Sequence, residues 1–195
     1  MQVLFVCSAN QCRSPMAAAL LQRYLTRGSA CSSIEVGSAG FGPAGYPATE
    51  GAIAAMDDIR IDITRHRSRL LDPDLLGGAD LVLAMTRQHV MDAVVLAPAA
   101  WPRTLPLVDA VRRAGQTGPM LAANDPGSWV ARLHAGRRPA DVLTLPPGDD
   151  IADPIDQPLD AYRRTRDQLD GLTRRLAELL REPEGRDFTP QPSRS

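Results

Sequence analysis

The feature that most constrains the fold lies at the start of the chain, where an apolar run meets a polar loop and then an Ala- and Leu-rich segment. Residues 3–6 read Val-Leu-Phe-Val, which is typical of a covered parallel strand. Pro15 suits the first turn of a helix, because the N–H that proline lacks would have no acceptor there. We therefore expect a strand, a tight loop at residues 7–14 and a helix from Pro15 to about Arg27.

The residue types in this loop suit phosphate chemistry. A loop that wraps onto a helix N-terminus points several backbone N–H groups into one concavity, which attracts an anion. The same field stabilises a thiolate, so we expect Cys7 to be ionised at neutral pH. The planar guanidinium of Arg13 can hold two phosphate oxygens, and Ser14 can donate a hydrogen bond to the sulfur. Asn10 tolerates the left-handed backbone that such a loop needs.

The pattern Val-Cys-x-x-Asn-x-Cys-Arg-Ser-Pro-Met near the N-terminus resembles the low-molecular-weight protein-tyrosine phosphatase family. The resemblance implies hydrolysis through a cysteinyl-phosphate, with Cys7 as nucleophile and Arg13 as clamp. It also implies a three-layer, flavodoxin-like α/β sandwich of the phosphatase I type, with a four-stranded parallel sheet in the order 2-1-3-4. The expected phosphate-binding residues are Ser8, Ala9, Asn10, Gln11, Cys12 and Arg13.

The rest of the chain alternates short apolar runs with helical patterns, which indicates a doubly wound parallel sheet. Further strands are expected at residues 34–38, 79–85 and 103–105, and helices at 49–57, 87–96 and 158–181. Thr49 and Thr86 are the expected caps of the first two of these helices. Gly/Pro-rich stretches at 115–119 and 124–127 read as loops, and residues 128–135 as a short helix. We expect one phosphatase-like domain over residues 1–182, with a long connection at about 111–150 and a flexible tail at 183–195.

A proton donor for the leaving group is expected just before the last helix. Asp153 precedes a proline there, and the resemblance implies that it protonates the leaving oxygen and then activates water. Asp149, Asp150 and Asp156 are nearby alternatives, and Asp-Pro is also a frequent loop dipeptide.

Two residues distant in sequence are expected to support the loop. Ser38 and His66 lie in stretches that resemble the family's second and third signatures, and by that resemblance they would brace Asn10 and Ser14. The stretch that carries His66 departs from the family at Arg60, where glycine is usual.

The cysteines do not suggest a disulfide framework, since there are three of them. Cys12 lies in the same loop as Cys7, and the resemblance implies that the two can close reversibly and protect the nucleophile. Burial as a small loop residue is the alternative reading of Cys12. Cys31 is expected to be inert. We expect no metal and no cofactor, since His and Cys do not cluster in the sequence.

The substrate is less well determined than the chemistry. Family tyrosine phosphatases usually carry an aromatic residue after Asp-Pro, where this chain has Ile155 and Asp156. Phe41 and Tyr46 are an alternative aromatic wall. We expect phosphotyrosine-type phosphomonoesters on proteins, with a protein-arginine phosphatase as the close alternative, although that group typically has Thr where Gln11 stands. An arsenate reductase and a non-catalytic phosphate-binding module are weaker alternatives.

Charge and hydropathy narrow the choice of partners. The formal net charge is −1, which gives no basic excess for nucleic acid or an anionic membrane. There is no apolar run near twenty residues and no signal-peptide pattern. We therefore expect a cytoplasmic enzyme whose partner is a phosphorylated protein substrate, such as a tyrosine kinase or its targets.

Overall fold

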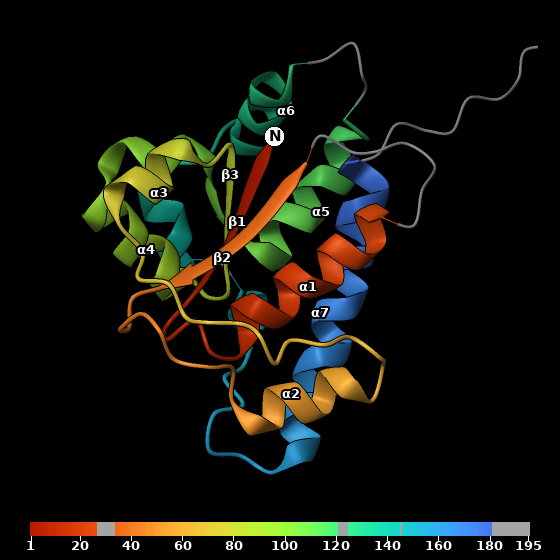
Figure 1. Ribbon diagram of the computed structural model, residues 1–195. Coiled ribbons are helices and arrows are strands. Elements are labelled where there is room, and N and C mark those ends of the chain that lie inside the picture. The colour runs from red at the N-terminus through yellow and green to blue at the C-terminus, as the bar shows by residue number, and fades with distance from the viewer. Residues whose placement is uncertain (27–33, 121–124, 145, 181–195) are drawn as a thin grey trace, which may run out of the picture.

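Four parallel strands form a sheet in the order β2-β1-β3-β4, as the sequence predicted. The strands are β1 (Gln2–Cys7), β2 (Glu35–Gly40), β3 (Leu81–Ala84) and β4 (Thr104–Pro106). This computed structural model describes residues 1–26, 34–120, 125–144 and 146–180. In it β1 is central, because it pairs with β2 on one side and β3 on the other. All strands are parallel, so their carboxyl ends meet at one edge, at the bottom of Figure 1.

Helices cover both faces of the sheet, with α1, α5 and α7 on one face and α3 and α4 on the other (Figure 1). The α-helices are α1 (Arg13–Thr26), α2 (Glu50–Asp57), α3 (Pro73–Gly78), α4 (Arg87–Leu96), α5 (Leu107–Thr117), α6 (Pro126–His134) and α7 (Leu159–Leu180). Within the described residues, the 3₁₀ segments are η1 (Pro98–Arg103), η2 (Pro139–Thr144) and η3 (Pro147–Asp149). The arrangement confirms the predicted doubly wound α/β sandwich.

The apolar run in β1 is buried on both faces of the sheet. Val3 and Phe5 pack into the core under α1, α5 and α7, whereas Leu4 and Val6 pack into the cluster on the opposite face. Successive strand side chains point to opposite faces, so a central strand covered on both sides must be apolar throughout. This burial fixes where β1 ends and therefore where the loop that follows Val6 begins.

Side-chain caps set the start of two helices as the sequence predicted. The Thr49 hydroxyl accepts a hydrogen bond from the Ala52 N–H at 3.3 Å. The Thr86 hydroxyl accepts one from the His89 N–H at 3.2 Å. Each hydroxyl satisfies a donor that the helix itself leaves without a partner.

The prediction of a loop at residues 115–119 is wrong for its first part, since α5 continues through Gly115 to Thr117. Ala110 and Ala114 are fully buried beside α7, and this packing outweighs the low helix propensity of glycine. The helix ends at Gly118, whose φ of 86° is a left-handed value. Similarly, the predicted loop at 124–127 is wrong at its end, because residues 126 and 127 open α6. The predicted tail at 183–195 and Cys31 lie outside the described residues.

Among the helices that the structure describes, none combines the length and the apolar composition that a membrane span requires.

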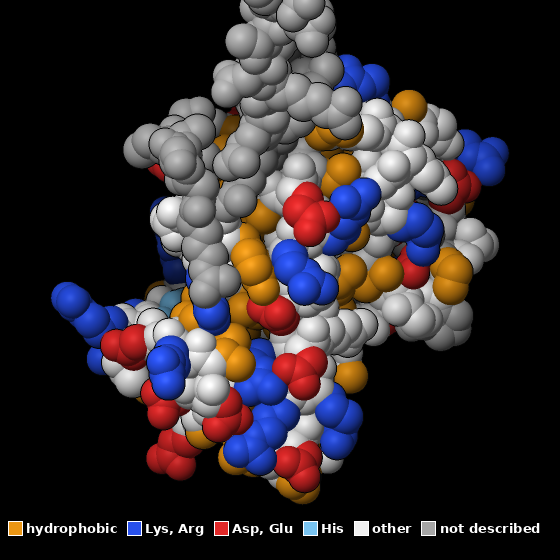
Figure 2. Space-filling model, turned by 90° about the vertical axis from the view of Figure 1, so that its right-hand side faces the viewer, with side chains coloured by type: hydrophobic (Ala, Val, Ile, Leu, Met, Phe, Trp, Pro, Cys, Tyr) orange, Lys and Arg blue, Asp and Glu red, His pale blue; other side chains and the backbone are white. Residues whose placement is uncertain are grey.

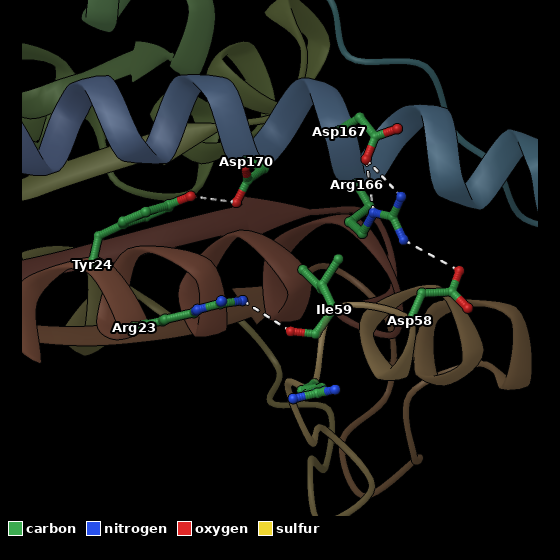
Figure 3. Close-up of a pocket in the computed structure, with 8 residues that line it drawn as sticks. Arg23, Tyr24, Asp58, Ile59, Arg166, Asp167 and Asp170 are labelled. Atoms are coloured by element: carbon green, nitrogen blue, oxygen red, sulfur yellow. Dashed lines mark hydrogen bonds and ion pairs between the residues drawn. The ribbon is translucent and has the colours of Figure 1, made fainter. Parts of the chain in front are cut away.

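A hollow of about 320 Å³ lies where the last turn of α1 meets the residues just after α2 and the first half of α7. Arg23 donates to the Ile59 carbonyl at 3.0 Å, and the Tyr24 hydroxyl donates to Asp170 at 2.7 Å (Figure 3). Arginine and acidic side chains are interleaved around a band of apolar side chains on this side of the molecule (Figure 2). The hollow lies at the opposite end of α1 from the loop at residues 7–13, so it is separate from the predicted phosphate site.

Arg60, which also lines this hollow, explains why glycine is usual at its position. Its φ is 58°, and its N–H bonds the Asp57 carbonyl at 2.8 Å while the Ile61 N–H bonds the Met56 carbonyl at 3.1 Å. These two bonds define a Schellman end of α2, in which the left-handed residue is normally glycine.

We expect Arg60→Gly to stabilise the fold. A left-handed L-residue costs roughly 1–2 kcal/mol, and the extra unfolded-state freedom of glycine offsets about 0.5–1 kcal/mol of the relief. The melting temperature should therefore rise by about 1–4 °C in a thermal unfolding experiment. Arg60→Ala is the matched control, because it removes the same charge and keeps the Cβ. An equal rise in both variants would assign the effect to charge and contradict the backbone explanation.

Candidate active site

The loop between β1 and α1 is held in shape by Asn10, whose φ of 53° lies in the left-handed region. Its side-chain amide donates to the Ser14 hydroxyl and to the Ser38 hydroxyl, each at 2.9 Å. Its Oδ1 accepts from the Arg69 N–H at 2.8 Å, and its own carbonyl accepts from His66 Nε2–H at 2.6 Å. The structure thus brings Ser38 and His66 to Asn10, and Ser14 is reached through the asparagine side chain.

The Cys7 sulfur has a hydroxyl donor beside it. Its Sγ lies 2.9 Å from the Ser14 hydroxyl, and the residue is 3% exposed. Because Asn10 donates into the Ser14 oxygen, the serine keeps its proton to donate elsewhere. The other acceptor in reach, the Ala39 carbonyl, lies at 3.4 Å, so the sulfur is the nearer one. A hydroxyl that donates to the sulfur stabilises the thiolate.

The loop also offers unused hydrogen-bond donors. In the described part of the chain, no protein acceptor bonds the backbone N–H groups of residues 9–13. The Nε of Arg13 is buried and likewise has no partner among the described residues. Buried N–H donors that lack partners are rare in folded proteins, and several that face one concavity suit an oxyanion. The Cys7 sulfur lies at the start of the same loop.

The guanidinium of Arg13 joins this loop to the segment just before α7. Its NH1 donates to the Ile151 carbonyl at 3.1 Å, and its NH2 donates to the Ser8 hydroxyl at 3.2 Å and to the Asp153 carboxylate. Arg13 is 3% exposed, whereas the Asp153 side chain is 37% exposed. The structure therefore places a partly solvent-accessible carboxylate next to the Arg13 guanidinium.

The three alternative acids are occupied elsewhere or point to solvent. Asp149 forms an ion pair with Arg112 at 2.9 Å, and it raises the pKa of that guanidinium further. Asp150 forms an ion pair with Arg87 at 3.0 Å. Asp156 is exposed, with a φ of 62°. These contacts also give the connection at 111–150 a structural role, since ion pairs at its ends hold the segment that carries Asp153.

Gly40 makes room for the loop. A Cβ at this position would lie 2.6 Å from the Asn10 nitrogen and 2.8 Å from the carbonyl oxygens of both Cys7 and Ser8. All three neighbours are backbone atoms, so none of them can rotate away. The second family signature thus has a steric cause that spacing alone did not reveal.

Cys12 is 1% exposed, and burial raises the pKa of its thiol well above the usual range, with Asp153 and Cys7 adding to the effect. Both Cys7 and Cys12 are free thiols. Cys12 is therefore protonated and buried in the structure, so its reversible closure with Cys7 stays a prediction.

Sequence reasoning missed one residue at this site. His89, near the start of α4, is 6% exposed, and its Nε2 lies 2.9 Å from the Ser8 hydroxyl. Nothing in the sequence marked it, because a single histidine in a helix carries no spacing signal. Phe41, predicted as a possible aromatic wall, stacks on the His89 ring with a centroid distance of 6.0 Å, and Tyr46 is 53% exposed.

Within the described residues, no group of three or more His, Cys, Asp or Glu side chains is arranged to hold a metal ion.

A family model described as low molecular weight phosphotyrosine protein phosphatase matches residues 2–117. The chain belongs to this family of cysteine-dependent phosphatases, as its first signature predicted.

Within this family, the chain is similar to two curated relatives and to one solved structure. A protein-arginine-phosphatase of Geobacillus stearothermophilus is 34% identical over 180 residues, which covers 92% of this chain and 95% of the relative. A probable low molecular weight protein-tyrosine-phosphatase, EpsP of Ralstonia solanacearum, is 44% identical over 84 residues, which covers 43% of this chain and 54% of the relative. The structure of YwlE arginine phosphatase from Geobacillus stearothermophilus has a TM-score of 0.66 at 34% identity and covers 91% of this chain and 90% of that one.

We expect Gly40→Ala to disrupt the loop. The added Cβ would displace the backbone at Asn10, and misplacing reacting groups by about 1 Å costs roughly a hundredfold in rate. The change is measured as kcat/KM on an aryl phosphate. Gly37→Ala is the matched control in the same strand, because its Cβ would make only an ordinary 3.7 Å contact with Leu4. Similar losses in both variants would point to a general weakness of β2 and contradict the steric explanation.

Proposed function

We propose that this chain is a protein phosphatase that uses Cys7 as nucleophile, Arg13 as phosphate clamp and Asp153 as general acid. The observation that supports the proposal is that these three groups lie together at one loop. Cys7 begins the loop, its sulfur is 2.9 Å from a hydroxyl that can donate to it, and the Arg13 guanidinium at the end of the loop bonds Asp153. A nucleophile, an anion cradle and a proton donor are what phosphoryl transfer through a covalent intermediate requires.

The proposed reaction has two steps. The Cys7 thiolate attacks phosphorus, the bond from phosphorus to the leaving atom breaks, and protonated Asp153 gives its proton to that atom. The Asp153 carboxylate then takes a proton from water, whose oxygen attacks phosphorus and breaks the P–S bond. This second step releases inorganic phosphate and restores the thiolate and the protonated acid. The loop N–H groups and Arg13 stabilise the charge on the phosphoryl oxygens in both steps.

We propose phosphoarginine as the preferred substrate. Support comes from the relatives that match almost the whole chain and are named protein-arginine phosphatases, at 34% and 31% identity. The segment after Asp153 adds to this, since Asp156 is exposed there and Ile155 replaces the aromatic residue usual in tyrosine phosphatases. A guanidinium remains charged, so carboxylates beside the site suit it better than an apolar wall does. Gln11 departs from the threonine typical of arginine phosphatases.

Phosphotyrosine is the second candidate, and the sequence placed it first. The tyrosine-phosphatase relative has the higher identity, 44%, over the part that it covers. Phe41 lies beside the loop, because its N–H donates to the Ser8 carbonyl at 2.7 Å. That ring could form one wall of a phenol site.

The other candidate functions, arsenate reduction and non-catalytic phosphate binding, are less well supported. Proteins named arsenate reductase match 43% of the chain at 35–37% identity. Thioredoxin-coupled enzymes of that class need two further redox cysteines, and residues 78–100 contain none. A non-catalytic phosphate-binding module would not need a thiolate or an acid beside the clamp.

A substrate panel tests the function and the preference together. Phosphate release from phosphoarginine, phosphotyrosine and phosphoserine peptides is measured for the wild type and for Cys7→Ser. We expect the highest kcat/KM on the phosphoarginine peptide, and no turnover of any peptide by the serine variant. Faster turnover of phosphotyrosine would reverse the proposed preference and leave the cysteine chemistry intact. Turnover by Cys7→Ser at the wild-type rate would reject the nucleophile.

Loss of the general acid should slow the reaction strongly. We expect Asp153→Ala to lower kcat on an aryl phosphate by about two to four decades, the usual scale for removing a positioned acid or base. Asp156→Ala, which removes an exposed carboxylate three residues away, is the control and should stay within about twofold of the wild type on this small substrate. If Asp156→Ala were the slower variant, the acid would be misassigned.

A further inference from the structure

His89 connects two hydroxyl groups beside the candidate active site. Its Nε2 lies 2.9 Å from the Ser8 hydroxyl, and its Nδ1 lies 2.9 Å from the Thr86 hydroxyl. The ring is buried and stacks on Phe41 at an interplanar angle of 15°, so burial, stacking and the two hydroxyl contacts together fix its orientation. Each ring nitrogen has one hydroxyl neighbour, so what His89 does to these hydroxyls depends on which nitrogen carries the ring proton.

The hydrogen bonds of the α4 cap favour one tautomer of His89. The Thr86 hydroxyl already accepts the His89 backbone N–H at 3.2 Å, and its own proton can go to Nδ1. Nε2 then carries the ring proton and donates it to Ser8. In the opposite tautomer Nδ1–H would donate to Thr86, whose hydroxyl proton would have no acceptor among the described residues. Burial, together with Arg13, lowers the pKa of His89 to about 4, so the ring is neutral and Nδ1 can accept.

This tautomer of His89 determines which hydrogen bonds the Ser8 hydroxyl accepts and which it can donate. Arg13 NH2 lies 3.2 Å from the same oxygen, and a guanidinium can only donate. A hydroxyl accepts two hydrogen bonds and donates one, so donors from Arg13 and His89 fill its acceptor sites. The Ser8 hydroxyl proton is then available for a further hydrogen bond. Ser8 is exposed, and its oxygen lies next to the Arg13 guanidinium.

We propose that His89 is a positioning residue that, by donating to Ser8, directs the Ser8 hydroxyl proton onto an oxygen of the bound phosphoryl group. The Ser8 side chain thereby adds a donor to the cradle of backbone N–H groups and Arg13. The proposal rests on the proposed phosphatase function and deepens it, because it assigns Ser8 a side-chain role and gives His89 a role that acts through Ser8.

The direct test removes the Ser8 donor. Ser8→Ala should lower kcat/KM on an aryl phosphate by about ten- to a hundredfold and weaken competitive inhibition by inorganic phosphate, since a hydrogen bond to a charged group is lost. Ser8→Thr keeps the hydroxyl and should retain most of the activity. Unchanged phosphate inhibition in Ser8→Ala would overturn the proposal.

The second test separates positioning from packing. The amide nitrogen of His89→Gln can reach the place of Nε2 and keep a donor on Ser8, whereas the shorter His89→Asn can replace only Nδ1 and its contact with Thr86. We expect His89→Gln to stay within about threefold of the wild type and His89→Asn to lose about tenfold in kcat/KM and in phosphate affinity. The reverse order, or equal losses in both, would overturn the proposal.

Coupling to Ser8 completes the test. In a Ser8→Ala background, His89→Asn should cause no further loss, because its effect acts through the hydroxyl that is already absent. A loss that persists in that background would assign His89 a structural role instead. All these measurements use an aryl phosphate and inorganic phosphate, so they are independent of the substrate preference. Wild-type turnover by Cys7→Ser would mark failure of the proposed function itself.

Discussion

The site depends on the side chain of Asn10, which holds the loop in shape and is neither the nucleophile nor the acid of the proposed chemistry. A loop of a few residues between a buried strand and a helix must turn sharply, and here one residue in the left-handed region makes the turn. Asparagine tolerates this conformation better than most residues, and its amide then supplies bonds to Ser14, Ser38 and the Arg69 backbone. These bonds hold the loop backbone in one conformation, so little conformational entropy would be lost when an anion binds its N–H groups.

A second constraint operates through Arg13, which is shared between two segments far apart in sequence. Its guanidinium bonds the loop at Ser8 and, at Ile151 and Asp153, the segment that precedes α7. That segment is also held by Arg87 and by Arg112, which reach Asp150 and Asp149. The connection between α5 and α7 therefore does more than join two helices, because its ion pairs help to fix the segment that carries Asp153.

The elements near the site could be predicted from the sequence because their signals are local. Thr49 and Thr86 were recognised as caps, since a hydroxyl before an apolar-periodic run is a short-range pattern. The course of α5 through Gly115 could not be predicted, because burial of Ala110 and Ala114 against α7 overrides propensity there. Arg60 shows a middle case. Its departure from glycine was visible in the sequence, but the left-handed turn that explains the preference appeared only with the hydrogen bonds at the end of α2.

By itself the sequence determined the family and the residues of the loop, because an apolar strand, Cys7, Arg13 and a helix start lie within fifteen consecutive residues. The sheet order followed from the resemblance to that family. Only the tertiary structure decided which of four aspartates stands beside Arg13, and only it brought His89 to Ser8. These contacts join residues 140 and 81 positions apart. Contacts at such separations arise from the packing of α4 and of the segment before α7 at the carboxyl edge of the sheet, and no periodicity in the sequence encodes them.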